Sequence, residues 1–212
     1  MAAIGVLFDL DGVLIDSETT YTRFWEEIDR IYPTGIEDYA IAIKGTTLPE
    51  ILKHYDDEMV RTDIVRRVIE FQENLTFNLY DGVAEFLTDL RRNSIRTAIV
   101  TSSDNRKMQL LFSQIPLLKE LVDTVIDASM VERSKPNPEG YLKAAAALGC
   151  APKDCYVFED SLQGLKAGTD SGATVIALST TYPRETLNGK AAKIIDGFVG
   201  FSVKDMLSIN KL

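Results

Sequence analysis

Short apolar runs rich in β-branched residues alternate along the chain with stretches in which apolar residues recur at helical spacing. The runs predict strands at residues 3–8, 95–101, 122–127, 155–159 and 173–178. Strands that are apolar almost throughout are typical of parallel sheets buried on both faces. The alternation therefore predicts an α/β fold, a Rossmann-like parallel sheet covered by helices on both sides.

Residues 16–80 depart from this alternation, because they contain no clear strand. Helical patterns run over 17–31, 36–43, 48–55 and 61–78. A helical stretch of about 65 residues is too long for a simple connection between two strands. We therefore predict an all-helical cap domain, residues 16–80, inserted into a discontinuous core made of residues 1–15 and 81–212. The junctions at Asp16–Ser17 and Tyr80–Gly82 are the expected hinges.

Composition limits the function classes. The chain has 212 residues, 45% of them hydrophobic, and its 23 basic and 32 acidic residues give a net charge of −9. These values are typical of a globular protein and exclude disordered and collagen-like classes. The acidity and the scattered Lys and Arg argue against nucleic-acid partners and against docking on an anionic membrane. No apolar run reaches the roughly 18 residues of a membrane helix.

The N-terminal run and the cysteines indicate neither a signal peptide nor a metal site. The apolar run 1–8 has no basic flank and ends at Asp9, which favours a buried strand over a signal peptide. Cys150 and Cys155 lack metal-site spacing and lie far from His54, the single histidine, which we place on a surface helix. We expect reduced, unreactive thiols in a cytoplasmic protein. With no sustained heptad pattern, we expect a monomer.

Two predicted strands end in pairs of acids. The first is followed by Asp9 and Asp11, and the fourth ends in Glu159 and Asp160. Residues two apart in an extended chain point the same way, and ligands of α/β sheets bind at the carboxyl ends of strands. Asp9, Glu159 and Asp160 would together form an oxygen-rich site for a hard cation such as Mg²⁺. Exposed acids at strand ends and a dipole-favoured pair at a helix start remain the simpler alternatives.

Hydroxyl groups and a lysine stand at two further strand ends. Thr101, Ser102 and Ser103 precede a helical stretch, and hydroxyls beside the free N–H groups of a helix start suit a phosphate. A plain helix N-cap is the alternative for them. Lys135 precedes a proline-rich helix start and could neutralise a phosphate, or it could be a solvated surface lysine.

These motifs together resemble the haloacid dehalogenase superfamily, in its branch with a helical cap. The resemblance is carried by Asp9-x-Asp11-Gly12-Val13-Leu14, Thr101-Ser102-Ser103, Ser134-Lys135-Pro136 and Phe158-Glu159-Asp160-Ser161. It covers nearly the whole predicted core, and it covers the cap by position and helical character. The branch contains phosphoglycolate phosphatases, sugar phosphatases and β-phosphoglucomutases.

The resemblance implies a Mg²⁺-dependent phosphatase that acts on a small phosphomonoester, such as a sugar or polyol phosphate, through an aspartyl-phosphate. Asp9 would be the nucleophile and Asp11 the general acid and base. Asp9, the backbone carbonyl of Asp11 and Asp160 would hold the cation, with Glu159 as a further or outer ligand. Thr101, Ser102 and Lys135 would bind the phosphoryl oxygens. A dehalogenase is disfavoured, because that branch needs neither Mg²⁺ nor the second aspartate.

The cap is expected to choose the substrate. Trp25, Lys44, Gly45, Ser103 and Asn105 are candidates for substrate contact. A β-phosphoglucomutase-type mutase is the alternative, since Trp25 and the Lys44-Gly45 pair match that branch. Those enzymes resemble this chain less at Tyr21, where they carry His, and near Leu48, where an Arg holds a second phosphate. Asp104 stands about where they place a basic residue.

A more distant alternative is a non-catalytic phospho-acceptor of the receiver type. Such domains also combine clustered aspartates with Thr or Ser and Lys at strand ends. The position of Asp9 on the first strand, the acid two residues later and the helical insertion all oppose it.

Overall fold

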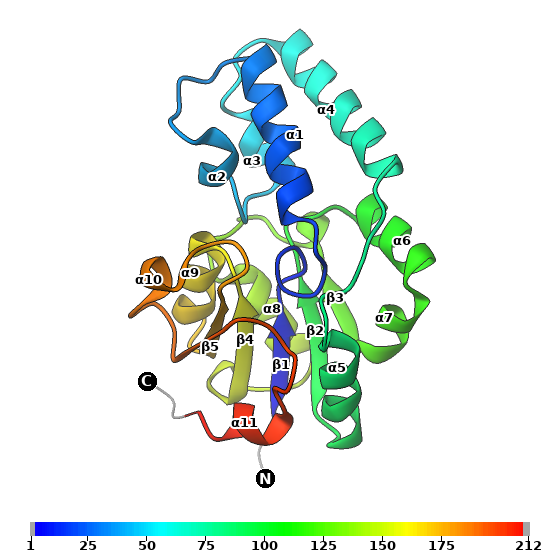
Figure 1. Ribbon diagram of the computed structural model, residues 1–212, viewed down its shortest axis with the longest axis vertical. Coiled ribbons are helices and arrows are strands. Elements are labelled where there is room, and N and C mark those ends of the chain that lie inside the picture. Colours follow the sequence, from blue (N-terminus) through cyan, green and yellow to red (C-terminus); the bar gives the residue numbers. More distant parts are fainter. Residues whose placement is uncertain (1–2, 210–212) are drawn as a thin grey trace.

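The computed structural model describes residues 3–209, so Met1 and Ala2 at the start of the first apolar run lie outside the described residues. Its centre is one parallel sheet in the order β3-β2-β1-β4-β5-β6. The strands are β1 Gly5–Phe8, β2 Arg96–Val100, β3 Thr124–Ile126, β4 Cys155–Glu159, β5 Thr174–Leu178 and β6 Lys193–Ile195. The predicted α/β fold with an inserted helical cap is confirmed (Figure 1). All five predicted strands are present, and the short edge strand β6 was missed.

Helices cover both faces of the sheet (Figure 1). Apolar side chains of one face pack with α5 Val83–Arg92, α6 Asn105–Gln114, α7 Pro116–Leu121 and α11 Val203–Leu207. Those of the other face pack with α8 Glu139–Ala147, α9 Leu162–Asp170 and α10 Arg184–Leu187. Short 3₁₀ turns occur at Ala128–Met130 and Pro152–Asp154. Among residues 3–209, no helix has the length and apolar character needed to cross a bilayer.

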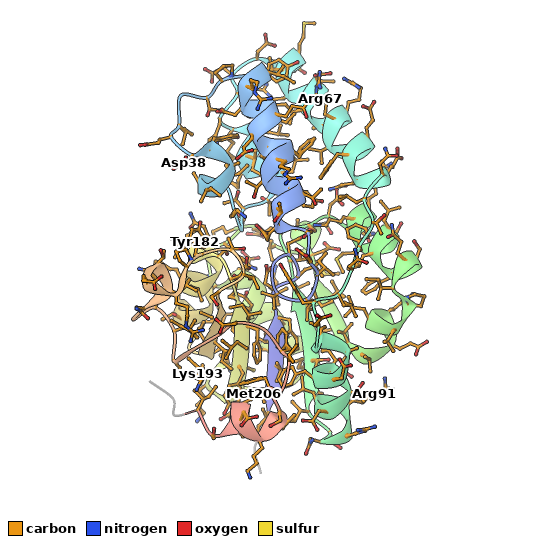
Figure 2. The ribbon with its side chains drawn as sticks, viewed as in Figure 1. Asp38, Arg67, Arg91, Tyr182, Lys193 and Met206 are labelled. Atoms are coloured by element: carbon orange, nitrogen blue, oxygen red, sulfur yellow. The ribbon has the colours of Figure 1, made fainter. Side chains whose placement is uncertain are left out.

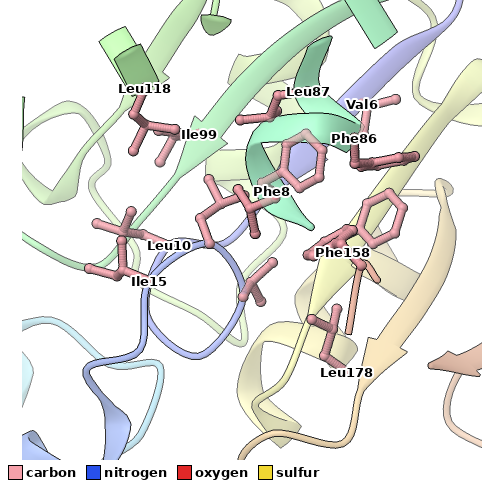
Figure 3. Close-up of a cluster of buried hydrophobic side chains, with 14 of the residues drawn as sticks. Val6, Phe8, Leu10, Ile15, Phe86, Leu87, Ile99, Leu118, Phe158 and Leu178 are labelled. Atoms are coloured by element: carbon pink, nitrogen blue, oxygen red, sulfur yellow. The ribbon is translucent and has the colours of Figure 1, made fainter. Parts of the chain in front are cut away.

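Alternation along β1 explains the two layers of the core. Val6 and Phe8 face one layer and Leu7 faces the other, and all three are buried. Figure 3 shows Phe8 beside Phe158 and Phe86 in the first layer. The rings of Phe8 and Phe158 stack with their centroids 5.0 Å apart, a contact worth about 0.5–1.5 kcal/mol beyond its buried area. This packing fixes β1 beside β4, and so fixes the relative positions of the acids that follow these strands.

The cap consists of α1 Glu18–Ile31, α2 Tyr39–Ala42, α3 Leu48–Leu52 and α4 Glu58–Glu73, which lie beyond the carboxyl ends of the strands (Figure 1). It has its own apolar cluster, in which Trp25, Ile28 and Ile64 are buried. The predicted helix 36–43 is one turn only, and α3 ends before His54, which is exposed in the following turn.

The last cap helix differs most from its predicted range of 61–78. Asp57 caps it by accepting a hydrogen bond from the Met59 N–H at 2.7 Å, so α4 begins at Glu58. It ends at Glu73, because Leu75 and Phe77 are buried in the core on alternate positions and require an extended chain.

A tight loop follows β1 and precedes the cap (Figure 1). Gly12 has φ +78°, and a Cβ there would overlap the Asp160 carboxylate, so this position requires glycine. The Gly12 N–H donates to the Ile15 carbonyl at 3.0 Å, and the Thr180 hydroxyl donates to the Gly12 carbonyl at 2.5 Å. The loop thus holds Gly12 against Asp160, the residue that follows β4.

Candidate active site

The carboxyl ends of β1, β2 and β4 meet beneath the cap, as expected for the binding edge of a parallel sheet. A cavity of about 370 Å³ lies there between core and cap. Of the residues predicted to bind metal, phosphate or substrate or to act in catalysis, the cavity is lined by Asp9, Asp11, Trp25, Lys44, Gly45, Thr101, Ser102, Ser103 and Asp160. Asn105, at the exposed start of α6, is not among the lining residues, and Lys135 and Glu159 lie behind Asp9.

Lys135 joins the first and fourth strands electrostatically. Its ammonium lies 2.6 Å from Asp9 Oδ1 and 2.6 Å from Glu159 Oε1, and it also donates to the Val100 carbonyl at 3.2 Å. Lys135 is buried, which excludes the solvated-lysine alternative. Burial raises the pKa of the Asp9 carboxyl to about 8, with Lys135 opposing and Glu159 adding to the rise. The site therefore needs further positive charge to keep Asp9 ionised at neutral pH.

Three buried carboxylates provide a place for that charge. Asp9, Glu159 and Asp160 each offer an oxygen within 4.8 Å of the others. Asp160 Oδ1 is buried and has no hydrogen-bond partner within the described part of the chain, while Oδ2 accepts from the Thr181 hydroxyl. Burial and the charges of Glu18 and Glu159 raise the pKa of the Asp160 carboxyl well above its ordinary value. Oxygen ligands, an unpartnered carboxylate oxygen and uncompensated negative charge fit a hard divalent cation such as Mg²⁺.

Glu159 is more fully engaged than the two aspartates. Its Oε1 accepts from Lys135 and from the Tyr141 hydroxyl at 2.7 Å. Its Oε2 accepts from the Asp160 and Ser161 N–H groups and from the Ser161 hydroxyl, each at 3.0 Å. A carboxylate with this many partners is suited to orienting the loop after β4.

Asp11 has a different environment from Asp9. Lys107 Nζ lies 2.6 Å from both carboxylate oxygens, Ser103 Oγ donates to Oδ2 at 3.1 Å, and Ser17 Oγ donates to Oδ1. Burial alone would raise the pKa of Asp11, but Lys107 and the two hydroxyls hold it below its ordinary value. The two aspartates thus have different proton affinities, and Asp11 is the more acidic of the two. A positive charge beside Asp9 would be needed to reverse this order, so that Asp9 is the ionised member of the pair and Asp11 the protonated one.

The three hydroxyl residues after β2 do not cap the following helix, because Asp104 is the N-cap of α6. The Asp104 side chain accepts a hydrogen bond from the Lys107 N–H at 2.8 Å. Thr101 Oγ1 accepts from the Ser103 N–H at 3.0 Å, and Ser102 Oγ donates to the Gly45 carbonyl at 2.7 Å. The hydroxyls therefore border the cavity and connect it to the cap.

The cap wall of the cavity is mainly apolar. It includes Trp25, Ala40, Ile43, Leu48, Pro49, Ile51 and Val68. Trp25 is buried and also packs on Phe24, so cap packing and contact with the cavity coexist. Among residues 3–209, the buried Tyr21 Oη and Gln72 Oε1 have no hydrogen-bond partner, and both residues line the cavity.

Two charged residues of the site were not found from the sequence. Glu18, the first residue of α1, pairs with Lys44 inside the cavity. Lys107 is buried on α6 with Met108 and Leu111. The sequence feature that could have revealed it is a lysine at a position on the apolar face of the helix.

Comparison with known sequences adds to this geometry. A model of the haloacid dehalogenase-like hydrolase family matches residues 6–178. Hexitol phosphatase A of Escherichia coli K12 is 30% identical over 195 residues, which cover 89% of this chain and 88% of that protein. Validoxylamine A 7'-phosphate phosphatase of Streptomyces hygroscopicus subsp. limoneus is 30% identical over 190 residues, 85% of this chain and 88% of its own.

Solved structures show the same architecture. A hydrolase of haloacid dehalogenase family IA, variant 3, from Entamoeba histolytica superposes with a TM-score of 0.83 at 26% identity, covering 99% of both chains. β-Phosphoglucomutase of Clostridium difficile superposes with a TM-score of 0.79 at 20% identity, covering 97% of this chain and 96% of that one. At this identity the second likeness concerns the fold alone.

Proposed function

Because the chain belongs to the haloacid dehalogenase-like hydrolase family and is a phosphatase within it, we propose that it hydrolyses a sugar or polyol phosphate through an aspartyl-phosphate on Asp9. The observation that carries this proposal is the Asp9 carboxylate, held by Lys135 under a cavity beside a second, differently paired aspartate. Two relatives are named as a hexitol phosphatase and a validoxylamine A 7'-phosphate phosphatase, and these names support the choice of substrate class.

The first step transfers the phosphoryl group to the protein. A carboxylate oxygen of Asp9 forms a bond to phosphorus while the bond from phosphorus to the ester oxygen breaks. The carboxyl group of Asp11 gives its proton to the leaving oxygen, which departs as an alcohol. Thr101, Ser102 and Lys135 would bind the phosphoryl oxygens. In the structure the Ser102 hydroxyl donates to the Gly45 carbonyl, and the Lys135 ammonium donates to Asp9, Glu159 and the Val100 carbonyl, so these donors would exchange a partner for a phosphoryl oxygen. Donors held in place in this way stabilise the charge that develops on those oxygens.

The second step returns the protein to its starting state. The Asp11 carboxylate takes a proton from water as the water oxygen attacks phosphorus, and the bond between phosphorus and the Asp9 oxygen breaks. Inorganic phosphate leaves with the added oxygen. Asp11 ends protonated and is ready for the next ester.

Mg²⁺ would be held by Asp9, Asp160 and the backbone carbonyl of Asp11, with Glu159 orienting the loop from outside. When bound, it supplies the positive charge that reduces repulsion between the Asp9 carboxylate and a phosphate dianion.

The charges of the cavity support a neutral leaving group. Of the residues described by the structure, Lys44 and Lys107 are the cations of the cavity wall, and each is paired, with Glu18 and Asp11 respectively. A second phosphate or a carboxylate would have no unpaired cation to contact there. Leu48 lines the wall where a mutase needs an arginine, which disfavours the bisphosphate chemistry of a mutase.

The apolar cap wall is compatible with a sugar or polyol. A sugar presents C–H faces that pack on aromatic and aliphatic side chains such as Trp25. Its hydroxyls could pair with Tyr21 Oη and Gln72 Oε1, which otherwise stay buried without partners. Pockets of this type bind a ligand mainly through apolar contacts, and a few polar groups fix the orientation of that ligand.

We also propose that residues 16–80 act as a cap that closes over the substrate, with 1–15 and 81–212 as the core. The cap contacts the core through the Ser102 hydroxyl and the Gly45 carbonyl, and through the Tyr182 hydroxyl and the Ile41 carbonyl at 3.5 Å. Tyr182 is labelled at this boundary in Figure 2. Closure would exclude bulk water from the first step.

The test is phosphate release from a panel of sugar, polyol and small-acid phosphates, with Mg²⁺ or with EDTA. We expect release from one or a few neutral esters, its loss in EDTA, and its loss in Asp9→Asn with an unchanged thermal melt. Asp11→Asn should slow turnover by about 10²–10⁴-fold. The control Asp56→Asn changes an exposed cap carboxyl and should keep full activity.

Several outcomes contradict the proposal. Full activity of Asp9→Asn rules out the nucleophile. Conversion of β-glucose 1-phosphate to the 6-phosphate with a bisphosphate primer, without phosphate release, shows a mutase. A stable phosphate on Asp9 without turnover shows a phospho-acceptor.

A further inference from the structure

Lys107 is the buried cation of the site to which the proposed reaction gives no role. Its side chain is 2% exposed, and it comes from α6, which carries none of the family motifs. We propose that Lys107 is a positioning residue that acts through Asp11, holding its carboxyl group in the orientation that exchanges protons with the leaving oxygen and with water. This inference rests on the proposed function, in which Asp11 is the general acid and base.

The hydrogen bonds of Asp11 support this role. Each carboxylate oxygen has one hydroxyl donor, Ser17 for Oδ1 and Ser103 for Oδ2. The Lys107 ammonium alone contacts both oxygens, at 2.6 Å each, and so restricts rotation of the carboxyl group about the bond that carries it. Without Lys107, each oxygen keeps a single donor on a flexible hydroxyl. A loosely held general acid loses the alignment that proton transfer requires.

A purely structural role would favour a different residue at position 107. The side chain lies on the buried face of α6 beside Met108 and Leu111, where an apolar residue of similar length would pack without desolvating a charge. Replacing both partners of a buried ion pair by apolar residues is often neutral or stabilising, whereas removing one partner leaves an unpaired buried charge and is destabilising. The packing of α6 therefore gives no reason for a lysine, and the reason lies in its pairing with Asp11.

The cap completes the surroundings of this ammonium. The ring of Tyr21, from α1, has its centroid 4.2 Å from Lys107 Nζ. A cation over an aromatic face is attracted to it and is shielded from water. Lys107 therefore contacts the core at Asp11 and the cap at Tyr21, so Asp11 is held firmly when the cap is in the position seen here.

The test compares two phosphate esters that differ in their need for a general acid. p-Nitrophenolate leaves without a proton, whereas a sugar or polyol alkoxide needs one. For Lys107→Met we expect kcat/KM for the preferred alkyl phosphate to fall about tenfold or more, and kcat/KM for p-nitrophenyl phosphate to change less than about twofold. Lys107→Met should cause no further loss in an Asp11→Asn background, because residues that act through one another are non-additive.

Two variants control the experiment. Arg106→Met removes the neighbouring cation of α6, which is paired with Glu73 at the surface, and should leave both esters unaffected. Lys107→Arg keeps the charge and should retain more alkyl phosphatase activity than Lys107→Met. If a thermal melt shows that Lys107→Met does not fold, two other variants replace it. One is Lys107→Gln. The other is the double variant Lys107→Met with Asp11→Asn, in which no carboxylate is left without its cation.

The outcomes separate this inference from the proposed function. Equal losses on both esters, or an additional loss in the Asp11→Asn background, overturn the role of Lys107 while leaving the phosphatase proposal intact. If Asp9→Asn and Asp11→Asn keep wild-type activity, or no ester is hydrolysed at all, the proposed function fails and the inference falls with it.

Discussion

At the scale of single residues, the site depends on side chains that stand behind the reacting groups. Glu139, at the start of α8, accepts hydrogen bonds from the N–H groups of Glu132 and Arg133 at 3.0 Å each and pairs with Lys143 at 2.6 Å. These contacts fix the segment that leads into Lys135. Lys143 and the backbone donors lower the pKa of the Glu139 carboxyl from its ordinary 4.5 to about 2.

This shift predicts a pH-dependent contribution to stability. A carboxyl whose pKa is lower in the folded state stabilises the fold fully above its unfolded pKa, 4.5, and loses that contribution as pH falls toward 2. Glu139→Gln should therefore lower the free energy of unfolding at pH 7, and its difference from wild type should shrink by pH 3. Urea unfolding at several pH values measures this. Glu185→Gln, exposed on α10, is the control, and a difference for Glu139→Gln that stays constant with pH would contradict the prediction.

The aspartates and hydroxyls of the site could be predicted because strand ends are visible in the sequence and parallel strands end at one edge. Lys107 could not, since it lies within a helix and not at a strand end, and it reaches Asp11 from 96 positions away in the chain. Glu18 has the same difficulty, because its partner Lys44 is brought to it only by the packing of the cap.

At the scale of elements, the approach of α9 to the end of β4 decides the shape of the acid cluster. Gly164 lies against the Glu159 carboxylate, and a Cβ at this position would overlap it. The Ser161 side chain caps the helix by accepting a hydrogen bond from the Gly164 N–H at 3.0 Å. Gly164 thus allows the first turn of α9 to lie directly against the Glu159 carboxylate, which pairs with Lys135.

Gly164→Ala should displace Glu159 and with it Lys135. Overpacking of a buried site costs about 1–3 kcal/mol, so we expect a lower melting temperature together with reduced phosphatase activity. Gly197→Ala is the matched control, because a Cβ at Gly197 meets no atom within 4 Å. Activity and melting temperature equal to those of the control would show that Glu159 is not held as described.

Most helices and strands could be predicted from local sequence patterns, and the two exceptions have identifiable physical causes. Apolar runs fixed β1, β2, β4 and β5, which are buried on both faces. The edge strand β6 spans only Lys193–Ile195, too short for its pattern to differ from a loop. Residues 74–78 resembled a helix continuation, but the burial of Leu75 and Phe77 in the core overrides that preference.

At the scale of the whole molecule, the cap loop carrying Lys44 and Gly45 rests directly on the core. Gly45 has φ +80°, and its Cβ would lie 2.7 Å from Ser161 Oγ and 3.3 Å from Gln163 Cβ. Its carbonyl also accepts the hydrogen bond of Ser102. A side chain at this position would hold the cap away from the core.

Gly45→Ala should therefore lower kcat/KM by about 10–100-fold, since small displacements of groups that close over a substrate have effects of this size. Gly35→Ala is the control, because it places alanine at a similar φ of +74° in the cap with open space around it. Both variants carry the same backbone strain, so their melting temperatures should fall alike while only Gly45→Ala loses activity. Equal kcat/KM values for the two would mean that the loop does not rest on the core during turnover.

The cap is joined to the core at one place by two adjacent segments. Ile15 and Leu79 form an antiparallel bridge, the Asp16 N–H donates to the Asn78 carbonyl at 3.0 Å, and the Tyr80 N–H donates to the Leu14 carbonyl at 3.0 Å. With its entry and exit side by side, everything between them can change in length and sequence without moving the strands that carry the aspartates. A protein engineer could therefore replace the whole segment between these junctions with the corresponding segment of a relative and leave the sheet in place.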